Sequence, residues 1–146
     1  GTAKDFERRV HYRKKEWIVD TKCKVEGDKV SLTFDNTTIV LPPAKAKKLA
    51  DAGCNGKTVV MGIRPEDIHD EESFIAKSPE SVFTTTIRIY ELLGAEVYLY
   101  FDVEGFDCTA RVNARTEARV GDEVKFAMDL SKLHIFDKDT EKVITN

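Results

Sequence analysis

The chain has 146 residues, of which 41% are hydrophobic and 34% charged, and its net charge is −3 with a pI near 5.7. This length suits one domain or two small subdomains and is enough to bury a core. The near-neutral balance excludes a global field that would recruit nucleic acid or anionic lipid. The sequence has no run of about 18 apolar residues and no apolar signal segment, so it predicts neither a membrane-spanning chain nor one secreted by a signal peptide.

The charges are distributed unevenly along the chain. Residues 1–24 contain eight Lys or Arg and four Asp or Glu, a balance of +4, so residues 25–146 carry −7. Phe6, Val10 and Trp17 form a weak helical stripe at the start, but clustered like charges disfavour an isolated helix there. We expect residues 1–21 to be an irregular basic leader, disordered or derived from cloning, followed by one domain over 22–146. A basic arm for nucleic acid or a phosphate-bearing partner is the alternative for this leader.

The three cysteines, Cys23, Cys54 and Cys108, are an odd number without CxxC spacing. This pattern implies neither a zinc site nor a disulfide framework. Because an oxidising compartment favours paired cysteines, we expect reduced, structural thiols in a cytoplasmic protein.

Alternating apolar and polar residues begin at residue 22. The pattern covers 22–34 with a Gly-Asp turn at 27–28, and a second turn at 35–37 precedes a strand at 38–41. Segment 42–57 instead favours one short helix: Pro43 suits a first helical position, and Gly53 with Asn55-Gly56 ends it.

The stretch "VVMGIRPED" over 59–67 predicts a buried strand that ends at a proline. Pro65 has no N–H for a ladder and pushes the preceding residue toward an extended conformation. The turn therefore leaves Arg64, Glu66 and Asp67 at a strand end. Such a mixed-charge strand end is either a solvated corner or a contact site, and the residue types alone do not decide between these two interpretations.

Segment 68–81 is acidic and rich in turn residues, so we expect an exposed excursion. Residues 82–113 predict two long strands, interrupted where Gly94 permits a turn or bulge. Positions 97, 99 and 101 face one way and Tyr98 and Tyr100 the other, with both faces partly covered, as in a barrel. A strand at 123–128, a turn at 129–132, a strand at 133–137 and a closing hairpin complete the pattern, which predicts a small all-β, OB-like barrel with one short helix.

Motifs of catalysis and metal binding are missing from the sequence. It has no GxxxxGK[ST] phosphate loop, and "GCNGKT" at 53–58 is too short to hold a triphosphate. His11, His69 and His134 are scattered without metal-ligand spacing, and no nucleophile signature occurs. We therefore expect no catalytic, cofactor-binding or metal-binding residues.

Two further clusters have a plain interpretation. Carboxylates at 66–72 lack the spacing of a calcium-binding loop and predict a solvated acidic loop. Aromatic residues at 98–106 are capable of stacking on bases, but the acidic residues among them repel phosphates, which disfavours nucleic-acid binding.

Four segments carry a resemblance to a known family: "VVMGIRPEDIHDEESF", "IYELLGAEVYLYF", "ARVNAR" and "VGDEVKFAMDLSKLHIFDKDTEKVI", in that order. From about residue 57 to the end, the chain resembles the C-terminal part of the ATP-binding subunits of multiple-sugar and maltose-type ABC importers. That part is a transport-associated OB-type (TOBE, MOP-like) barrel, and residues 22–56 resemble its opening strands. Where relatives have a segment of the type "FIGSPxMNF", this chain has "HYRKKEWIVDTK", so the resemblance implies nothing about residues 1–21.

The resemblance implies a regulatory domain that packs ATPase subunits together and receives regulatory proteins. Its implied partners are a second copy through the parent ATPase, the importer permease subunits through a separate ATPase domain, and a cytoplasmic regulatory protein. ATP and Mg are expected in that separate domain, so this chain itself is expected to hold no cofactor and to be no enzyme. It implies a cytoplasmic location at the inner face of the membrane, without nucleic-acid binding or membrane insertion.

By the same resemblance, the candidate contacts to a subunit or regulator are Arg64, Glu66, Asp67, Glu91 and Gly94. In the alternative view, Arg64 pairs with Glu66 or Glu91 and only holds the barrel corner. The rival function is a barrel that senses a small ligand or oxyanion, for which the candidate donors are Arg64, Arg88 and Arg111.

Overall fold

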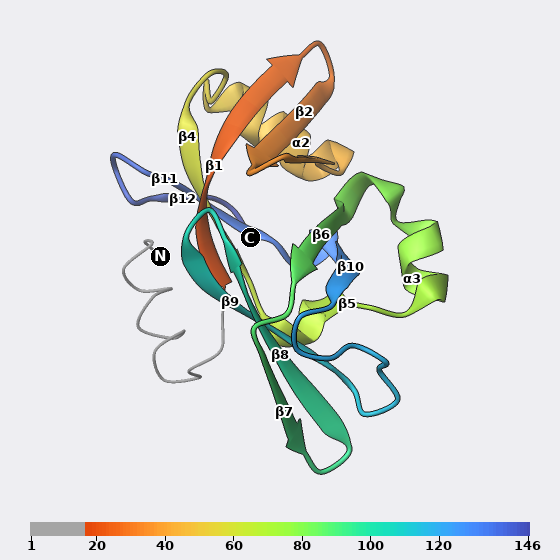
Figure 1. Cartoon of the computed structure of the whole chain (residues 1–146). Helices are drawn as coiled ribbons and strands as arrows, with labels where there is room; N and C mark the ends of the chain where they lie inside the picture. The colour runs from red at the N-terminus through yellow and green to blue at the C-terminus, as the bar shows by residue number, and fades with distance from the viewer. Residues whose placement is uncertain (1–16) are drawn as a thin grey trace.

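The structure is a computed structural model that describes residues 17–146, so the predictions for residues 1–16 lie outside it (Figure 1). In chain order the elements are β1 (Trp17–Glu26), β2 (Lys29–Phe34), β3 (Thr37–Val40), α2 (Pro43–Asp51), β4 (Thr58–Ile63), η1 (Pro65–Asp67), β5 (Ile68–His69), α3 (Glu72–Lys77), η2 (Pro79–Ser81), β6 (Val82–Thr86), β7 (Ile89–Leu93), β8 (Glu96–Val103), β9 (Phe106–Asn113), β10 (Glu123–Met128), η3 (Leu130–Lys132), β11 (His134–Asp137) and β12 (Val143–Thr145).

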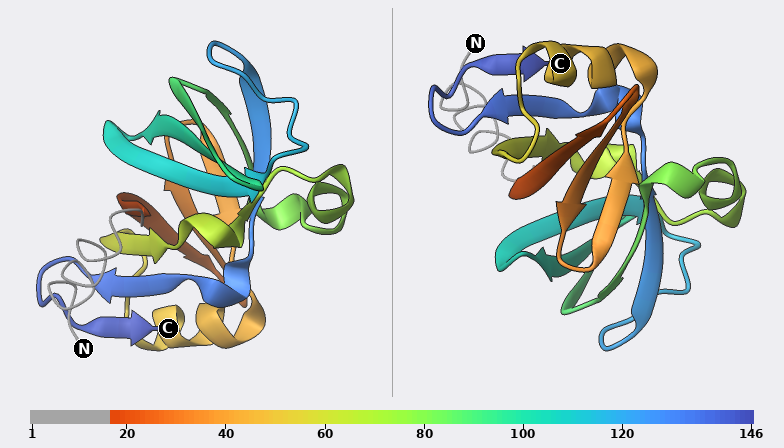
Figure 2. Two further views of the ribbon diagram at one scale, coloured as in Figure 1. Left: turned by 90° about the horizontal axis from the view of Figure 1, so that it is seen from below. Right: turned by 90° about the horizontal axis from the view of Figure 1, so that it is seen from above.

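The strands form three antiparallel sheets. A six-stranded sheet has the order β12-β11-β4-β1-β2-β3, and two three-stranded sheets have the orders β5-β10-β6 and β7-β8-β9. Helix α2 packs against β2 and β12, at the end of the molecule away from the β7–β8 hairpin (Figure 2). The prediction of a small OB-like β-barrel is confirmed.

One aromatic cluster joins the three sheets. Phe34 of β2, Phe83 of β6, Phe101 of β8 and Phe126 of β10 are all buried, and successive ring centroids lie 5.2–6.1 Å apart. Each such burial contributes on the order of 2–3 kcal/mol, so this cluster is the centre of the core.

The first strand begins earlier than the sequence indicated. β1 starts at Trp17, which pairs with Ile63 of β4, and the ladder continues to Lys22 opposite Thr58. Residues 17–21, assigned above to the leader, therefore belong to a strand. β4 supplies a long antiparallel partner, and this tertiary pairing outweighs the charge-rich local pattern.

Residues 82–113 form four strands in two sheets, so the expectation of two long strands was wrong. The first break lies at Ile87, whose N–H donates to Asp122 O at 3.0 Å while its carbonyl accepts from Gly121 N at 2.8 Å. These bonds to a distant loop replace a continuing ladder. The second break is the Glu104-Gly105 turn, and the interruption at Gly94 was predicted.

The middle of the acidic excursion over 68–81 is exposed, as predicted, but its two ends, Ile68 and Ser81, are buried, and it contains a second short helix. None of the residues of α3 is buried. The helix is held at its base by a stack of His69 on Phe74, with ring centroids 4.0 Å apart. Among residues 17–146, no helix is long and apolar enough to cross a membrane.

Candidate functional site

The first part of the candidate site is the corner formed by Arg64–Asp67. Arg64 is extended, with φ −81° and ψ 149°, as steric contact with a following proline requires, and Pro65 begins η1. Asp67 O accepts a hydrogen bond from Asp129 N at 2.9 Å, which ties the corner to the turn before η3. η1 also packs against β9, so the corner joins the six-stranded sheet to the β7–β8–β9 sheet.

Charge accumulates at this corner. Burial raises the pKa of Asp67, and the neighbouring carboxylates Glu66 and Asp129 raise it further, while Lys132 and Arg64 oppose them. Glu66 is exposed and Arg64 half-buried. The corner is thus partly covered and acidic, with Arg64 acting electrostatically on Asp67.

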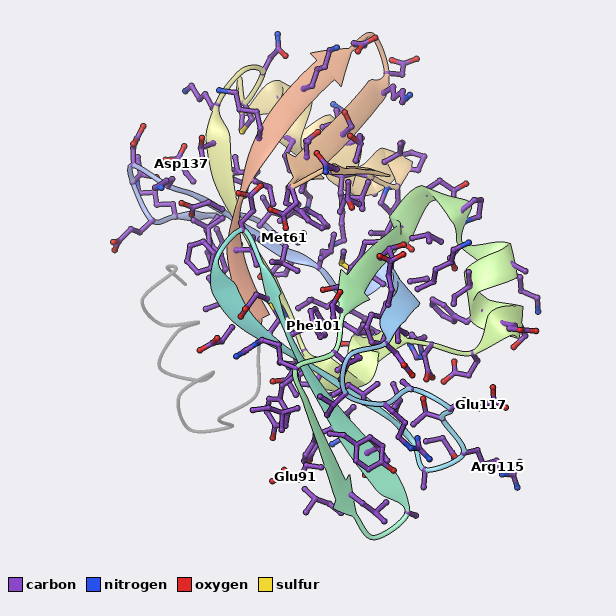
Figure 3. The ribbon with its side chains drawn as sticks, viewed as in Figure 1. Met61, Glu91, Phe101, Arg115, Glu117 and Asp137 are labelled. Carbon is purple, nitrogen blue, oxygen red and sulfur yellow. The ribbon has the colours of Figure 1, made fainter. Side chains whose placement is uncertain are left out.

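The second part is the β7–β8 hairpin, which projects from the body of the molecule (Figure 1). Its turn is Gly94-Ala95, and Gly94 has φ +65°, the conformation that a type II′ turn needs at its first central position. Figure 3 shows Glu91 on this hairpin, far from Phe101 in the core. Both Glu91 and Gly94 are exposed.

A row of polar side chains connects the hairpin with the corner. Glu91 of β7, Tyr98 of β8 and Arg111 of β9 are cross-strand neighbours. Burial lowers the pKa of Arg111, but its hydrogen bond with Tyr98 and the charges of Glu66 and Glu96 outweigh burial and raise it. Glu66 and Glu91 are therefore linked through Arg111 and Tyr98.

Two further contacts hold this row. Tyr100 Oη donates to Glu91 Oε1 at 3.0 Å, and burial together with this bond raises the pKa of Tyr100 to about 12. Arg111 Nε lies 3.1 Å from Glu96 Oε2, an ion pair whose angle does not make a hydrogen bond.

The structure thus separates the five sequence candidates. Glu66 and Glu91 share one polar row, Arg64 and Asp67 lie at the corner, and Gly94 lies at the hairpin tip. Their role as contacts to a subunit or regulator remains a prediction.

Sequence reasoning missed the apolar surface of the hairpin. Ile89, Leu92 and Leu93 expose 51%, 57% and 48% of their surface. The signal was the pair of adjacent leucines before Gly94, since two successive apolar residues cannot both face the core of a half-buried strand.

Two of the three arginines proposed for an oxyanion site, Arg88 and Arg111, have separate acidic partners. Arg88 Nη2 lies 3.1 Å from Asp102 Oδ1 and 3.0 Å from Asp107 Oδ1, whereas Arg111 pairs with Glu96. Asp107 and Arg111 are four residues apart on β9, which corresponds to roughly 13 Å. These pairings give an oxyanion site little support. Within residues 17–146, no group of His, Cys, Asp and Glu side chains is suited to hold a metal ion.

An open groove of about 1200 Å³ lies between the α3 excursion and the loop after β9, where Figure 3 labels Arg115 and Glu117. Six carboxylate side chains and two basic ones line it. Thr116 Oγ1 donates to Asp70 Oδ2 at 2.6 Å and joins its two walls. The lining repels polyphosphates.

The three cysteines are buried, which fits the prediction of structural thiols. Burial raises the pKa of Cys23 to about 11 and also raises those of Cys54 and Cys108. Because the thiolate is the reactive form, these thiols are unreactive at neutral pH.

Comparison with known families and proteins gives a consistent result. Residues 61–136 match the TOBE domain, and residues 21–68 match the MalK OB fold domain. The chain is 40% identical over 110 residues to the oligosaccharides import ATP-binding protein MsmX of Bacillus subtilis, covering 75% of this chain and 30% of that protein. It is 33% identical over 110 residues to the multiple sugar-binding transport ATP-binding protein MsmK of Streptococcus mutans, covering 75% of this chain and 29% of that protein. The chain therefore spans about 30% of the length of these relatives.

A solved structure shares the fold. The cytoplasmic molybdate-binding protein ModG superposes with a TM-score of 0.57 at 14% identity, covering 82% of this chain and 94% of that chain. At this identity the likeness concerns the fold alone.

Proposed function

We propose, from the premise that this chain belongs to the TOBE domain family, that it is the C-terminal regulatory domain of the ATP-binding subunit of a carbohydrate ABC importer. It acts through protein contacts. The observation that carries this proposal is the polar row from Glu66 through Arg111 to Glu91, which joins the corner to a projecting hairpin with exposed apolar residues.

The chain itself hydrolyses no ATP in this proposal. It lacks a phosphate loop, and its open groove carries a large excess of carboxylates. ATP and Mg are bound by a separate ATPase domain of the same polypeptide. Purified chain 1–146 should therefore release no phosphate from ATP above the blank.

The partners are a second copy of the parent subunit, the permease subunits through the ATPase domain, and a cytoplasmic regulatory protein. The subunit is cytoplasmic and peripheral at the inner face of the membrane. Arg64, Glu66, Asp67, Glu91 and Gly94 form the contact surface for a subunit or regulator.

The first experiment reads the gene upstream of the Gly1 codon. An in-frame phosphate loop and ABC signature are expected, and a reading frame that starts at Gly1 would overturn the proposal. In the full-length subunit assembled with its permease, Glu91→Lys should then change the regulation of transport while leaving ATP binding intact. Asp28→Lys, in the exposed β1–β2 turn, is the matched control and should leave regulation unchanged.

The second candidate is a barrel that senses a small ligand or oxyanion. Its support is the shared fold with ModG, which is named as a molybdate-binding protein. A ligand bound only by the native state raises its stability, so thermal unfolding with molybdate, sulfate, phosphate and a panel of sugars tests this candidate. An unchanged Tm across the panel removes it.

A further inference from the structure

The loop over residues 114–122, which joins β9 to β10, is tied to several parts of the fold. β9 and β10 belong to different sheets, so this β9–β10 loop crosses from one three-stranded sheet to the other. It contains no helix or strand and is longer than the roughly four to six residues of a typical connection. Its conformation therefore depends on the side chains and backbone groups that it contacts.

One side of the β9–β10 loop follows the projecting hairpin. At the base of the hairpin it exchanges two backbone hydrogen bonds with Ile87, and at the tip Ala114 N donates to Ala95 O at 3.0 Å. Between these points the guanidinium of Arg119 lies over the ring of Tyr90 in β7, with Cζ 4.8 Å from the ring centroid. This cation–π contact attaches the middle of the loop to the hairpin.

The other side of the loop reaches the α3 excursion through Thr116. Thr116 Oγ1 donates to Asp70 Oδ2 at 2.6 Å and accepts from Ala118 N at 3.2 Å. Asp70 lies two residues before α3, and both Asp70 and Thr116 line the open groove. The loop thus forms one wall of the groove and is bonded to the other wall.

Arg119 joins the two sides of the loop. Its Nη1 donates to Thr116 O at 3.1 Å and to Ala118 O at 2.8 Å. The guanidinium that stacks on Tyr90 therefore also holds the backbone around Thr116. A continuous chain of contacts runs from Tyr90 in β7, through Arg119 and Thr116, to Asp70 at the base of the excursion.

We propose that the β9–β10 loop couples the hairpin to the α3 excursion, so that a contact which holds the hairpin in place also orders the walls of the groove. The excursion is suited to respond, because none of the residues of α3 is buried and a helix of six residues has little stability of its own. This inference goes beyond the proposed function, since the coupling is a property of this chain alone.

A loop that only connects two strands would behave differently. The bonds to Ile87 and Ala95 would hold it against the hairpin, and the bond to Asp70 would hold it against the excursion, each independently of the other. Coupling therefore has to be measured at the end of the loop opposite to the one that is changed.

Amide hydrogen exchange of chain 1–146, followed by NMR, tests the coupling from the hairpin end. Tyr90→Leu removes the ring under Arg119 and leaves the loop and the excursion unchanged in sequence. It should speed the exchange of the Phe74 and Ile75 amides of α3 about two- to fivefold, the factor that corresponds to an exposed cation–π contact. Both amides donate to Glu71 O, at 3.1 and 3.0 Å. Tyr90→Phe keeps the ring and should leave both rates unchanged.

The reverse experiment starts from the excursion, because a coupling free energy acts in both directions. Asp70→Ala removes the acceptor of Thr116 and should speed the exchange of the Ala114 amide at the hairpin tip. Glu72→Ala removes an exposed carboxylate of the same excursion and, as the matched control, should leave the Ala114 rate unchanged.

A second pair of variants keeps the test decisive if Tyr90→Leu fails to fold. Arg119→Gln breaks the chain of contacts at its centre and should speed exchange at both ends of the loop. Arg115→Gln removes the same charge from an exposed position of the same loop and should change neither end. Circular dichroism checks that each variant is folded.

The Cys23 amide, which donates to Lys57 O at 2.9 Å far along β1, is the remote reference, and its exchange should stay constant in every variant. Unchanged Phe74 and Ile75 rates in the folded variants among Tyr90→Leu and Arg119→Gln overturn the coupling. An equal acceleration at Cys23 also overturns it, because the changes would then act on the whole fold. The proposed function stands in either case, since it does not depend on this loop.

Discussion

β8 has a turn at each end, and the two turns are built differently. At the β8–β9 turn, Glu104 N donates to Asp35 Oδ2 at 3.0 Å, and Asp35 N donates to Glu104 Oε1, so this turn and the β2–β3 turn cap each other. At the β7–β8 turn, Ala95 O accepts from Ala114 N at 3.0 Å, a bond within its own sheet region. The first turn fastens two sheets together, whereas the second projects with exposed leucines. We infer that the β8–β9 turn, which is fastened to the β2–β3 turn, contributes to stability. We infer that the projecting β7–β8 turn serves contact with a partner.

The largest expected effect on the free energy of unfolding is the contrast between two side-chain deletions, one at each end of this sheet. Phe101→Ala removes a fully buried ring from the aromatic cluster and should lower the free energy of unfolding by about 3–5 kcal/mol. Leu92→Ala, on the projecting hairpin, should change it by less than about 0.5 kcal/mol, because Leu92 is 57% exposed. Chemical denaturation of both variants checks the contrast, and equal losses would contradict it.

The fastened turn gives a smaller effect. Asp35 and Glu104 have φ of 49° and 52°, a conformation that disfavours residues other than Gly, yet both keep a carboxylate that caps the opposite turn. Glu104→Ala loses the bond from Asp35 N to Glu104 Oε1 and keeps both the bond from Glu104 N to Asp35 Oδ2 and the backbone strain, so it should cost about 1–2 kcal/mol. Glu104→Gly loses the same side-chain bond but relieves the strain, so it should cost less.

A double-mutant cycle checks the coupling at this turn. Each of Asp35→Ala and Glu104→Ala removes one of the two bonds. Together they should cost less than the sum of the single variants, because losing either bond loosens the contact between the two turns on which the other bond depends. Strict additivity would mean that the two turns do not stabilise each other.

The sequence predicted the ends of strands better than the joins between sheets. Pro43, Pro65 and Gly94 each act through local backbone geometry, and the helix start, the corner and the hairpin turn were all predicted correctly. The break at Ile87 was missed because its hydrogen bonds go to Gly121 and Asp122, more than thirty residues later.

The candidate site shows the same division. The turn chemistry at Pro65 and Gly94 indicated where charged or exposed residues lie, but the link between Glu66 and Glu91 depends on Arg111, a residue on a third strand. The capping of Asp35 by Glu104 spans 69 positions and follows no local pattern. Pairings of this kind come from tertiary structure and are not visible in a single sequence.

A change at the projecting turn should have a modest effect on stability. At Gly94, with φ +65°, an added Cβ meets no atom within 4 Å, so Gly94→Ala introduces backbone strain without a clash. It should lower the free energy of unfolding by about 1 kcal/mol and leave the fold intact. Thermal melts compared with Asp28→Ala, at an ordinary turn position, measure this effect. A loss as large as that of Phe101→Ala would show that the projecting turn also supports the core.

The smallest expected effect concerns Asp67 at the Arg64–Asp67 corner. It tests whether the ionised carboxylate of Asp67 destabilises the fold, as expected for a residue that does not serve stability. The folded state raises the pKa of Asp67 above its ordinary value, mainly through burial, so above that ordinary value the folded protein binds more protons than the unfolded chain. The ionised carboxylate therefore destabilises the fold, and stability should fall as pH rises from about 3.9 through the raised pKa. Asp67→Asn should raise the Tm at pH 7, and this gain should vanish at pH values below about 3.9. A lower Tm for Asp67→Asn at pH 7 would instead mean that the ionised carboxylate stabilises the corner. The corner would then contribute to stability, as the β8–β9 turn does.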